Sequence, residues 1–278
     1  MTTDNTLEKC KNHYFDRSES WWWCSLVVAI LTPIGAIIIE LSNKSPILTF
    51  ISFVIILSPA LITWSREIAN SYYDKGSLCR RVILYNKGLG EPISVADKCE
   101  ILEFSKNLKI PEYEKPYYVT EKNISPAKLV DMISESSFFT KYNAGVASDY
   151  LNKIFVFYLC VTLFIAYLCI EGTISKEATQ VIAKSAFFVV ALFIVNDFLL
   201  LKRKFDKLSA DSNIIFRDSE NLAKQSKISE YEALNLAERY NLILSISPPI
   251  PFFVYKKSRD ELNKKYREAH NIGGKQHG

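Results

Sequence analysis

Few side chains in this 278-residue sequence have the types and spacing that catalysis or metal binding requires. Histidines occur only at His13, His270 and His277, in the polar ends of the chain, and none belongs to an HExxH motif. Cys10 and His13 have the spacing of two metal ligands, but a structural zinc site needs four, so we expect no metal. GxSxG and P-loop motifs are also absent from the sequence, and we expect a protein that is not an enzyme and holds no cofactor.

Two other patterns have ordinary structural explanations. Gly88 and Gly90 form a lone GxG without the strand-then-helix context of a dinucleotide loop, which favours a turn. Asp97, Glu100 and Glu103 fall at helical spacing, where an acid pair is one interpretation and a solvent-exposed helix face is the favoured one.

Hydrophobicity is concentrated in four runs, although the overall 49% hydrophobic content and net charge of +4 are those of an ordinary soluble protein. The runs cover residues 21–41, 46–64, 154–170 and 183–201. Each is close to the roughly 20 residues that a membrane-spanning helix needs. The sequence therefore predicts four membrane spans, and the alternative is a soluble helical protein with unusually apolar hairpins.

The distribution of lysine and arginine predicts the orientation of these spans. The short connections carry only Lys44, Lys176 and Lys184 near the spans, whereas the other side carries many more basic residues. The four tryptophans, Trp64 and the triplet 21–23, also fall on that basic side, and indole rings favour the membrane interface. The triplet could instead be a surface that binds a partner. We therefore expect both termini and the long middle segment in the cytoplasm. All six cysteines then lie in the membrane or on the cytoplasmic side, where we expect reduced thiols.

These features predict an all-α integral membrane protein with two transmembrane helical hairpins and a helical cytoplasmic domain. The predicted parts are a cytoplasmic N-terminal segment at 1–20, a first hairpin at 21–64, a cytoplasmic insertion at 65–153, a second hairpin at 154–201 and a cytoplasmic C-terminal region at 202–278.

Local signals predict where the cytoplasmic helices begin. Ser125 is suited to cap free amides and Pro126 to occupy the first helical position, so we expect a helix that runs from there into the third span. The second span is expected to continue to Gly76. Two further helix starts are predicted at Ser94, with Asp97, and at Ser229, with Glu232.

Apolar spacing predicts which helix faces are buried. A partial heptad seam follows the fourth span and predicts pairing of helices, within or between subunits. It consists of Phe205, Leu208, Ser212, Ile215 and Leu222. A stripe is expected at Ala233, Ala237, Tyr240 and Leu244, and another at Val95, Cys99 and Leu102.

The order of these parts resembles the SMODS-associating four-transmembrane effector family of bacterial antiphage systems. The most specific segment is YYVTEKNISPAKLVDMISESSFFTK, whose residues 135–141 resemble the Glu-Ser, two aromatics and basic residue of that family. A second resemblance covers residues 239–259 of the tail.

The resemblance implies a pore-forming effector of the bacterial inner membrane. A cyclic oligonucleotide second messenger would activate it on phage infection, and loss of membrane integrity would abort the infection. The implied partners are the lipid bilayer, the messenger and further copies of the chain, with no DNA or RNA.

A nucleotide messenger needs basic side chains for phosphate and aromatic faces for bases. Candidate ligand-binding residues in the middle segment are Arg80, Arg81, Tyr117, Tyr118, Phe138, Phe139 and Lys141, and those in the tail are Tyr255, Lys257 and Arg259. The alternative is that the phenylalanines belong to the core and the basic residues meet anionic lipid.

For a pore, four helices per chain are too few to enclose a wide water path, so we expect a homo-oligomer. Asn196 and Asp197 lie inside the fourth run and are the candidate lumen residues, unless Asp197 reaches the inner headgroups. A different class of function is a membrane-anchored adaptor that binds a partner protein through the heptad-like seam. A transporter is disfavoured because the hairpins show no inverted repeat.

Overall fold

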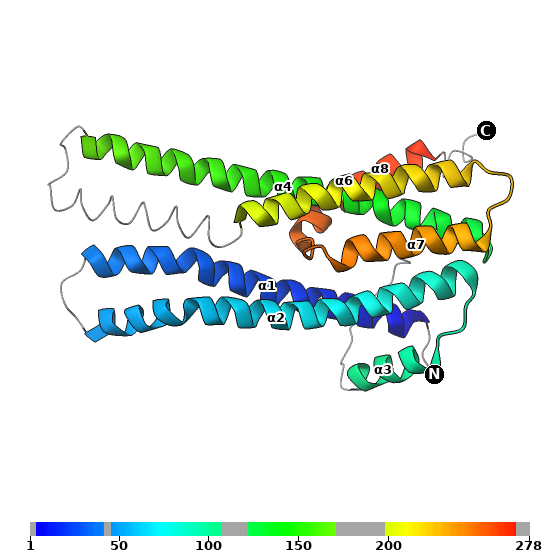
Figure 1. Cartoon of the computed structure of the whole chain (residues 1–278), viewed down its shortest axis with the longest axis horizontal. Coiled ribbons are helices and arrows are strands. Elements are labelled where there is room, and N and C mark those ends of the chain that lie inside the picture. The colour runs from blue at the N-terminus through cyan, green and yellow to red at the C-terminus, as the bar shows by residue number, and fades with distance from the viewer. Residues whose placement is uncertain (1–3, 42–45, 107–119, 121, 171–197, 271–278) are drawn as a thin grey trace. The chain divides into compact units, whose positions relative to one another are not determined.

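The computed structural model describes residues 4–41, 46–106, 120, 122–170 and 198–270 (Figure 1). The regular secondary structure in these ranges is entirely α-helical, which confirms the predicted all-α class. The helices are α1 (Asp4–Leu41), α2 (Pro46–Leu89), α3 (Val95–Ser105), α4 (Pro126–Ile170), α6 (Phe198–Ala223), α7 (Glu230–Ser245) and α8 (Phe252–Ala269). Within the described part of the chain, no helix carries an apolar stretch long enough to cross a membrane.

The chain divides into two compact units. Unit 1 comprises Met1–Glu19, Ser71–Ala147 and Lys204–Gly278, and unit 2 comprises Ser20–Asn70 and Ser148–Arg203. Helices α1, α2, α4 and α6 each contribute residues to both units. Unit 2 contains the described residues of the four apolar runs, and unit 1 contains α3, α7 and α8.

The three predicted helix starts are confirmed. The hydroxyl of Ser125 accepts a hydrogen bond from the amide of Lys128 at 3.2 Å, one residue before α4 begins. At α3 the hydroxyl of Ser94 accepts from the amide of Asp97 at 3.0 Å. At α7, Ser229 and Glu232 form the reciprocal capping box, which satisfies amides that have no partner within the helix.

The predicted end of the second helix at Gly76 is wrong, because α2 continues through that residue to Leu89. Gly76 is needed there for close packing, since a Cβ atom would lie 2.9 Å from ring carbons of Phe15 on α1. The helix ends instead before Gly90, whose φ of 74° is readily adopted only without a side chain. The amide of Ser125 donates to the carbonyl of Gly88 at 2.9 Å, which joins the start of α4 to the end of α2.

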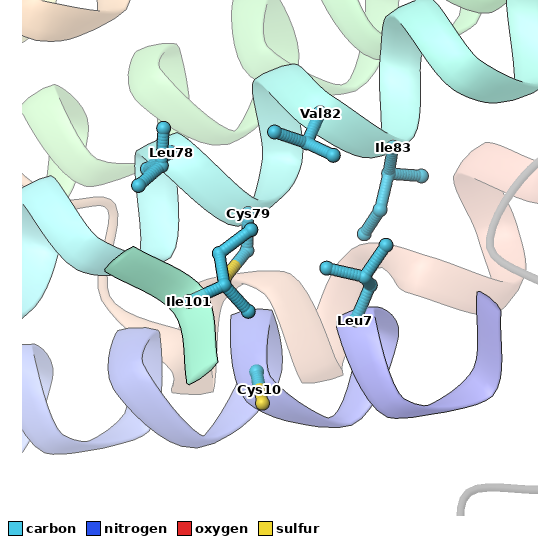
Figure 2. Close-up of a cluster of buried hydrophobic side chains, with 7 residues drawn as sticks. All are labelled: Leu7, Cys10, Leu78, Cys79, Val82, Ile83 and Ile101. Carbon is cyan, nitrogen blue, oxygen red and sulfur yellow. The ribbon is translucent and has the colours of Figure 1, made fainter. Parts of the chain in front are cut away.

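One core cluster of unit 1 joins α1, α2 and α3. Its buried members are Leu7, Cys10, Leu78, Cys79, Val82, Ile83 and Ile101 (Figure 2). The predicted buried face of α3 is wrong, since Val95 and Leu102 are 79% and 47% exposed and Cys99 is exposed. Helix α3 turns Ile101 into the cluster instead, and Phe104 packs against it.

The predicted stripes of α6 and α7 are confirmed with one change. Phe205, Leu208, Ser212 and Ile215 are buried on α6, whereas Leu222 is half-exposed and Ser219 takes the next buried position. All four predicted residues of the α7 stripe are buried. The seam of α6 is thus buried within a single chain.

Candidate ligand-binding site

An aromatic cluster in unit 1 gathers side chains from α4, α6 and α8. Phe138 on α4 lies at its centre, with its ring centroid 5.6 Å from that of Phe216 on α6 and 5.3 Å from that of Tyr266 on α8. Phe139 and Tyr142 on α4 complete the contacts, at centroid distances of 5.8 and 4.8 Å. Aromatic pairs at such distances stabilise beyond the area that they bury.

Two of the predicted cations lie at the edge of this cluster. The ammonium group of Lys141 is 5.2 Å from the ring centroid of Tyr142 and 6.0 Å from that of Phe216, within the range of cation–π attraction. Tyr255 on α8 lies 6.5 Å from Phe139, centroid to centroid. Burial raises the pKa of Tyr255, and the positive charge of Arg259 acts in the opposite direction, which places that cation near the phenol.

The predicted residues differ in how accessible they are to a ligand. Phe138 is only 7% exposed and packs with Leu262 and Tyr266 in a core cluster, as the alternative interpretation of the phenylalanines expects. Phe139, Lys141 and Tyr255 are half-buried. Lys257 and Arg259 are exposed on α8. The accessible candidates of the cluster are therefore Phe139, Lys141, Tyr255 and Arg259.

A layer of buried polar side chains on α4 lies beside the aromatic cluster. Ser134 donates to a carboxylate oxygen of Glu220 on α6 at 2.6 Å, and the hydroxyls of Thr140 and Tyr240 are 2.8 Å apart. Asn143 accepts from Ser258 on α8 at 2.6 Å. Such bonds are expected for buried polar groups, since leaving one unsatisfied costs about 1–3 kcal/mol.

Glu135 is the buried carboxyl group of this layer, with 4% of its surface exposed. Burial raises the pKa of both Tyr255 and Tyr266, and the negative charge of Glu135 raises both further. The carboxylate therefore lies close to two phenols of α8. Sequence reasoning included Glu135 in the family-like segment but assigned it no role.

Arg80 belongs to a second basic group, on α1 and α2. Its guanidinium carbon is 5.9 Å from the ring centroid of Phe15. Burial raises the pKa of Tyr240, and the positive charge of Arg80 acts in the opposite direction. Lys11 is 2% exposed, and burial is the largest cause that lowers its pKa to about 7. Arg81 is exposed on α2, and its guanidinium nitrogen lies 3.8 Å from a carboxylate oxygen of Asp97. Arg81 therefore belongs neither to the aromatic cluster nor to the basic group of Arg80 and Lys11.

Tyr240 connects the two groups. Its hydroxyl meets Thr140, which lies between Phe139 and Lys141 in the sequence, and its ionisation is influenced by Arg80. Sequence reasoning placed Tyr240 on a buried stripe but missed its polar role, and it missed Lys11. A hydroxyl on an otherwise apolar helical stripe is the signal that would have singled out Tyr240.

The remaining candidates lie outside the described residues. They are Tyr117, Tyr118, Asn196 and Asp197. Within the described ranges, no group of three or more histidine, cysteine, aspartate or glutamate side chains is arranged to hold a metal ion.

Comparisons of the chain with protein-family models, with curated proteins and with solved structures found no match. The resemblance to the four-transmembrane effector family stays a prediction that rests on the segments 135–141 and 239–259.

Proposed function

We propose that the chain is a membrane-disrupting effector of bacterial antiphage defence, anchored by unit 2 and activated by a cyclic oligonucleotide that binds unit 1. In this proposal four spans cross the inner membrane, with both termini in the cytoplasm. Activation opens the membrane and aborts the infection. The observation that carries the proposal is the large apolar surface of unit 2.

Unit 2 exposes large apolar side chains along α1, α2, α4 and the start of α6. Ile56 is 73% exposed, Phe157 is 65% exposed and Leu163 is 61% exposed. Exposed apolar surface of this extent marks a site that binds a partner or a membrane. The other members are Val27, Leu31, Val54, Leu57, Leu61, Ile154, Val156, Phe164, Tyr167, Leu199 and Leu200.

Two buried hydroxyl groups within the apolar runs are satisfied by the backbone of their own helix. Thr32 donates to the carbonyl of Val28 at 2.7 Å, and Ser58 donates to the carbonyl of Ile55 at 2.7 Å. A membrane interior requires such internal bonds because lipid offers no partner. At the basic end of the first two runs, the indoles of Trp21 and Trp64 meet at 5.6 Å, which suits a membrane interface.

The ligand part of the proposal rests on the accessible candidates of unit 1. Phe139 and Tyr255 offer aromatic faces for bases, and Lys141 and Arg259 offer positive charge for phosphates. A cyclic oligonucleotide carries both groups in one molecule. Phe139 and Lys141 lie on α4, and this helix continues to Ile170 in unit 2, so a change at the ligand reaches the apolar part along one helix.

Release of a fluorescent dye from liposomes tests the proposal directly. The full chain is reconstituted and exposed to a panel of cyclic di- and trinucleotides, with linear forms of the same nucleotides as controls. We expect one cyclic nucleotide to trigger release. If nucleotides bind, as thermal shift would detect, and none triggers release, the pore-forming function is rejected.

The adaptor is the second class of function to compare. Its expected docking seam on α6 is buried within the chain at Phe205, Leu208 and Ile215, so an adaptor would need another surface. That burial favours the effector over the adaptor. A homo-oligomer remains part of the proposal because one chain supplies too few helices to surround a water path.

A further inference from the structure

We infer that the connection between α7 and α8 is an interfacial anchor that inserts Leu242, Ile246 and Phe253 into the headgroup region of an anionic membrane. The inference rests on the proposed membrane function of unit 2. It assigns a lipid-binding role to residues 242–257, which form the end of α7, the connection and the first turns of α8.

Two hydrogen bonds place this segment within unit 1. The hydroxyl of Tyr73 on α2 donates to the carbonyl of Leu244 at 3.1 Å, and Ser258 on α8 donates to the side chain of Asn143 on α4 at 2.6 Å. Tyr73 and Asn143 each lie within about one helical turn of the residue at which their helix passes into unit 2. The connection therefore lies at the end of unit 1 from which α2 and α4 continue into the apolar runs.

The outer face of α7 becomes apolar as it approaches this end. Asn235 and Glu238 are exposed near the middle of the helix. Leu242 and Ile246 follow on the same face and are 64% and 60% exposed, and Phe253 is 42% exposed at the start of α8. Leu242 and Ile246 are spaced by one helical turn, so both side chains are able to enter the same layer of lipid.

The folding of the segment depends on other side chains. Leu244 and Val254 are 4% and 1% exposed, and Pro251 is buried. The exposed apolar side chains are thus additional to the core of unit 1. Large apolar side chains that stay this exposed are explained by an apolar environment outside the chain.

The backbone of the connection suits an environment poor in water. Pro248, Pro249 and Pro251 have no N–H group that would need a partner. The amide of Ser247 donates to the carbonyl of Leu244 at 3.3 Å, and its hydroxyl donates to the carbonyl of Ile243 at 2.6 Å. The irregular segment therefore loses few hydrogen bonds when it enters the headgroup region.

Positive charge accompanies the apolar side chains. Lys257 is exposed on α8 one turn after Phe253, and Lys204 and Lys207 are exposed on α6 where this helix enters unit 1. Apolar side chains combined with lysines at the same end of a unit are able to bind anionic lipid surfaces. The charge pattern therefore favours phosphatidylglycerol-type headgroups as the occupant.

Depth-dependent fluorescence quenching tests the anchor in the full chain. An environment-sensitive dye is attached to Ile246→Cys, with Cys24, Cys99, Cys160 and Cys169 replaced by serine. The matched control is Tyr231→Cys, because Tyr231 is 78% exposed at the other end of α7. A third protein keeps the native, exposed Cys160 within the third apolar run as its only labelled site.

We expect the dye at position 246 to be quenched most strongly by lipids that are spin-labelled near the headgroup, and more strongly when phosphatidylglycerol is present. The dye at position 231 should stay unquenched. Quenching at Cys160 without quenching at 246 would overturn the anchor and leave the membrane function standing. No quenching at Cys160 would reject the membrane function, and the anchor with it.

Discussion

The hydroxyl of Thr140 on α4 lies 2.8 Å from the hydroxyl of Tyr240 on α7, and both side chains are buried. The pair connects the aromatic cluster of α4 and α8 to the basic group around Arg80. Because the surroundings exclude water, neither hydroxyl has solvent to replace its partner if the other is removed.

Tyr240→Phe should therefore lower the free energy of unfolding by about 1–2 kcal/mol, since the ring still fills its place while the hydroxyl of Thr140 loses this bond. Thermal unfolding in detergent measures the change. Tyr231→Phe on the same helix is the control, because Tyr231 is 78% exposed. Equal effects of the two substitutions would contradict the role of the pair.

Two helical glycines should respond to alanine in opposite directions. At Gly88 a Cβ atom would lie 3.0 Å from the Cβ and 3.1 Å from the Cα of Leu129, and backbone cannot move aside cheaply. Gly88→Ala should lower the free energy of unfolding by about 1–3 kcal/mol, because the added methyl group overpacks the contact between α2 and α4. At Gly145 a Cβ atom would lie 3.6 Å from Ser209 Oγ, which is an ordinary contact distance. Gly145→Ala should therefore raise the free energy of unfolding by about 0.5–1 kcal/mol.

Melting temperatures of both alanine variants measure this difference. The close approach of α2 and α4 would be contradicted if Gly88→Ala were as stable as Gly145→Ala.

The buried Lys11 makes stability depend on pH. Burial lowers its pKa from the ordinary 10.5 to about 7, so the unfolded chain binds this proton more tightly than the folded chain. The destabilisation is complete below about pH 7 and disappears as pH rises toward 10.5. Lys11→Met should thus stabilise at pH 7, on the order of a few kcal/mol, and the gain should shrink as pH rises.

The difference in melting temperature between the native chain and Lys11→Met, recorded from pH 6.5 to 10, measures this linkage, with ~0.5-unit steps being sufficient. Lys9→Met on the same helix is the control, because the side chain of Lys9 is only half-buried. A gain that is constant across the pH range would show that Lys11 is not the titrating group.

Arg259 is the exposed cation of the proposed ligand site, and it is paired with a control on its own helix. Arg259→Gln should raise the nucleotide concentration for half-maximal dye release by about 10-fold or more, since a charge-assisted hydrogen bond contributes about 1.5–3 kcal/mol. Arg267→Gln, in the last turn of α8, should leave the nucleotide concentration for half-maximal release unchanged. If both substitutions weaken release equally, only net charge matters and the site is elsewhere.

Asp197 separates the effector from the adaptor. A carboxylate that faces a lumen should be required for ion passage, so Asp197→Leu should abolish or greatly reduce toxicity in cells, while Asp197→Asn should retain part of it. Growth after induced expression measures both variants, with membrane content checked by immunoblot. Full toxicity of Asp197→Leu would exclude a lumen role.

The sequence was sufficient for features that depend on neighbouring residues. The starts of α3, α4 and α7 follow from Ser94, Ser125 and Ser229, because a cap is a local interaction. The stripes of α6 and α7 follow from helical period alone. Two predictions failed where packing between distant segments decided the result, at Gly76 and on the face of α3.

The candidate site shows the same limit. Sequence reasoning found Phe139, Lys141 and Tyr255 by their chemistry, but their meeting depends on how α8 packs against α4. Glu135 and Lys11 were missed as buried charges, because burial of a charged residue follows from its neighbours in space and leaves no local pattern.

The bond between Ser125 and Gly88 also bears on how this architecture is able to diversify. Since the chain leaves α2 and returns to α4 at one point, the stretch between them is a cassette with adjoining ends. Among the described residues of the stretch, Ile93, Ile101 and Phe104 contribute to the core cluster, so a replacement cassette has to supply substitutes for them. Exchange of this stretch is therefore possible while the helices on either side keep their register.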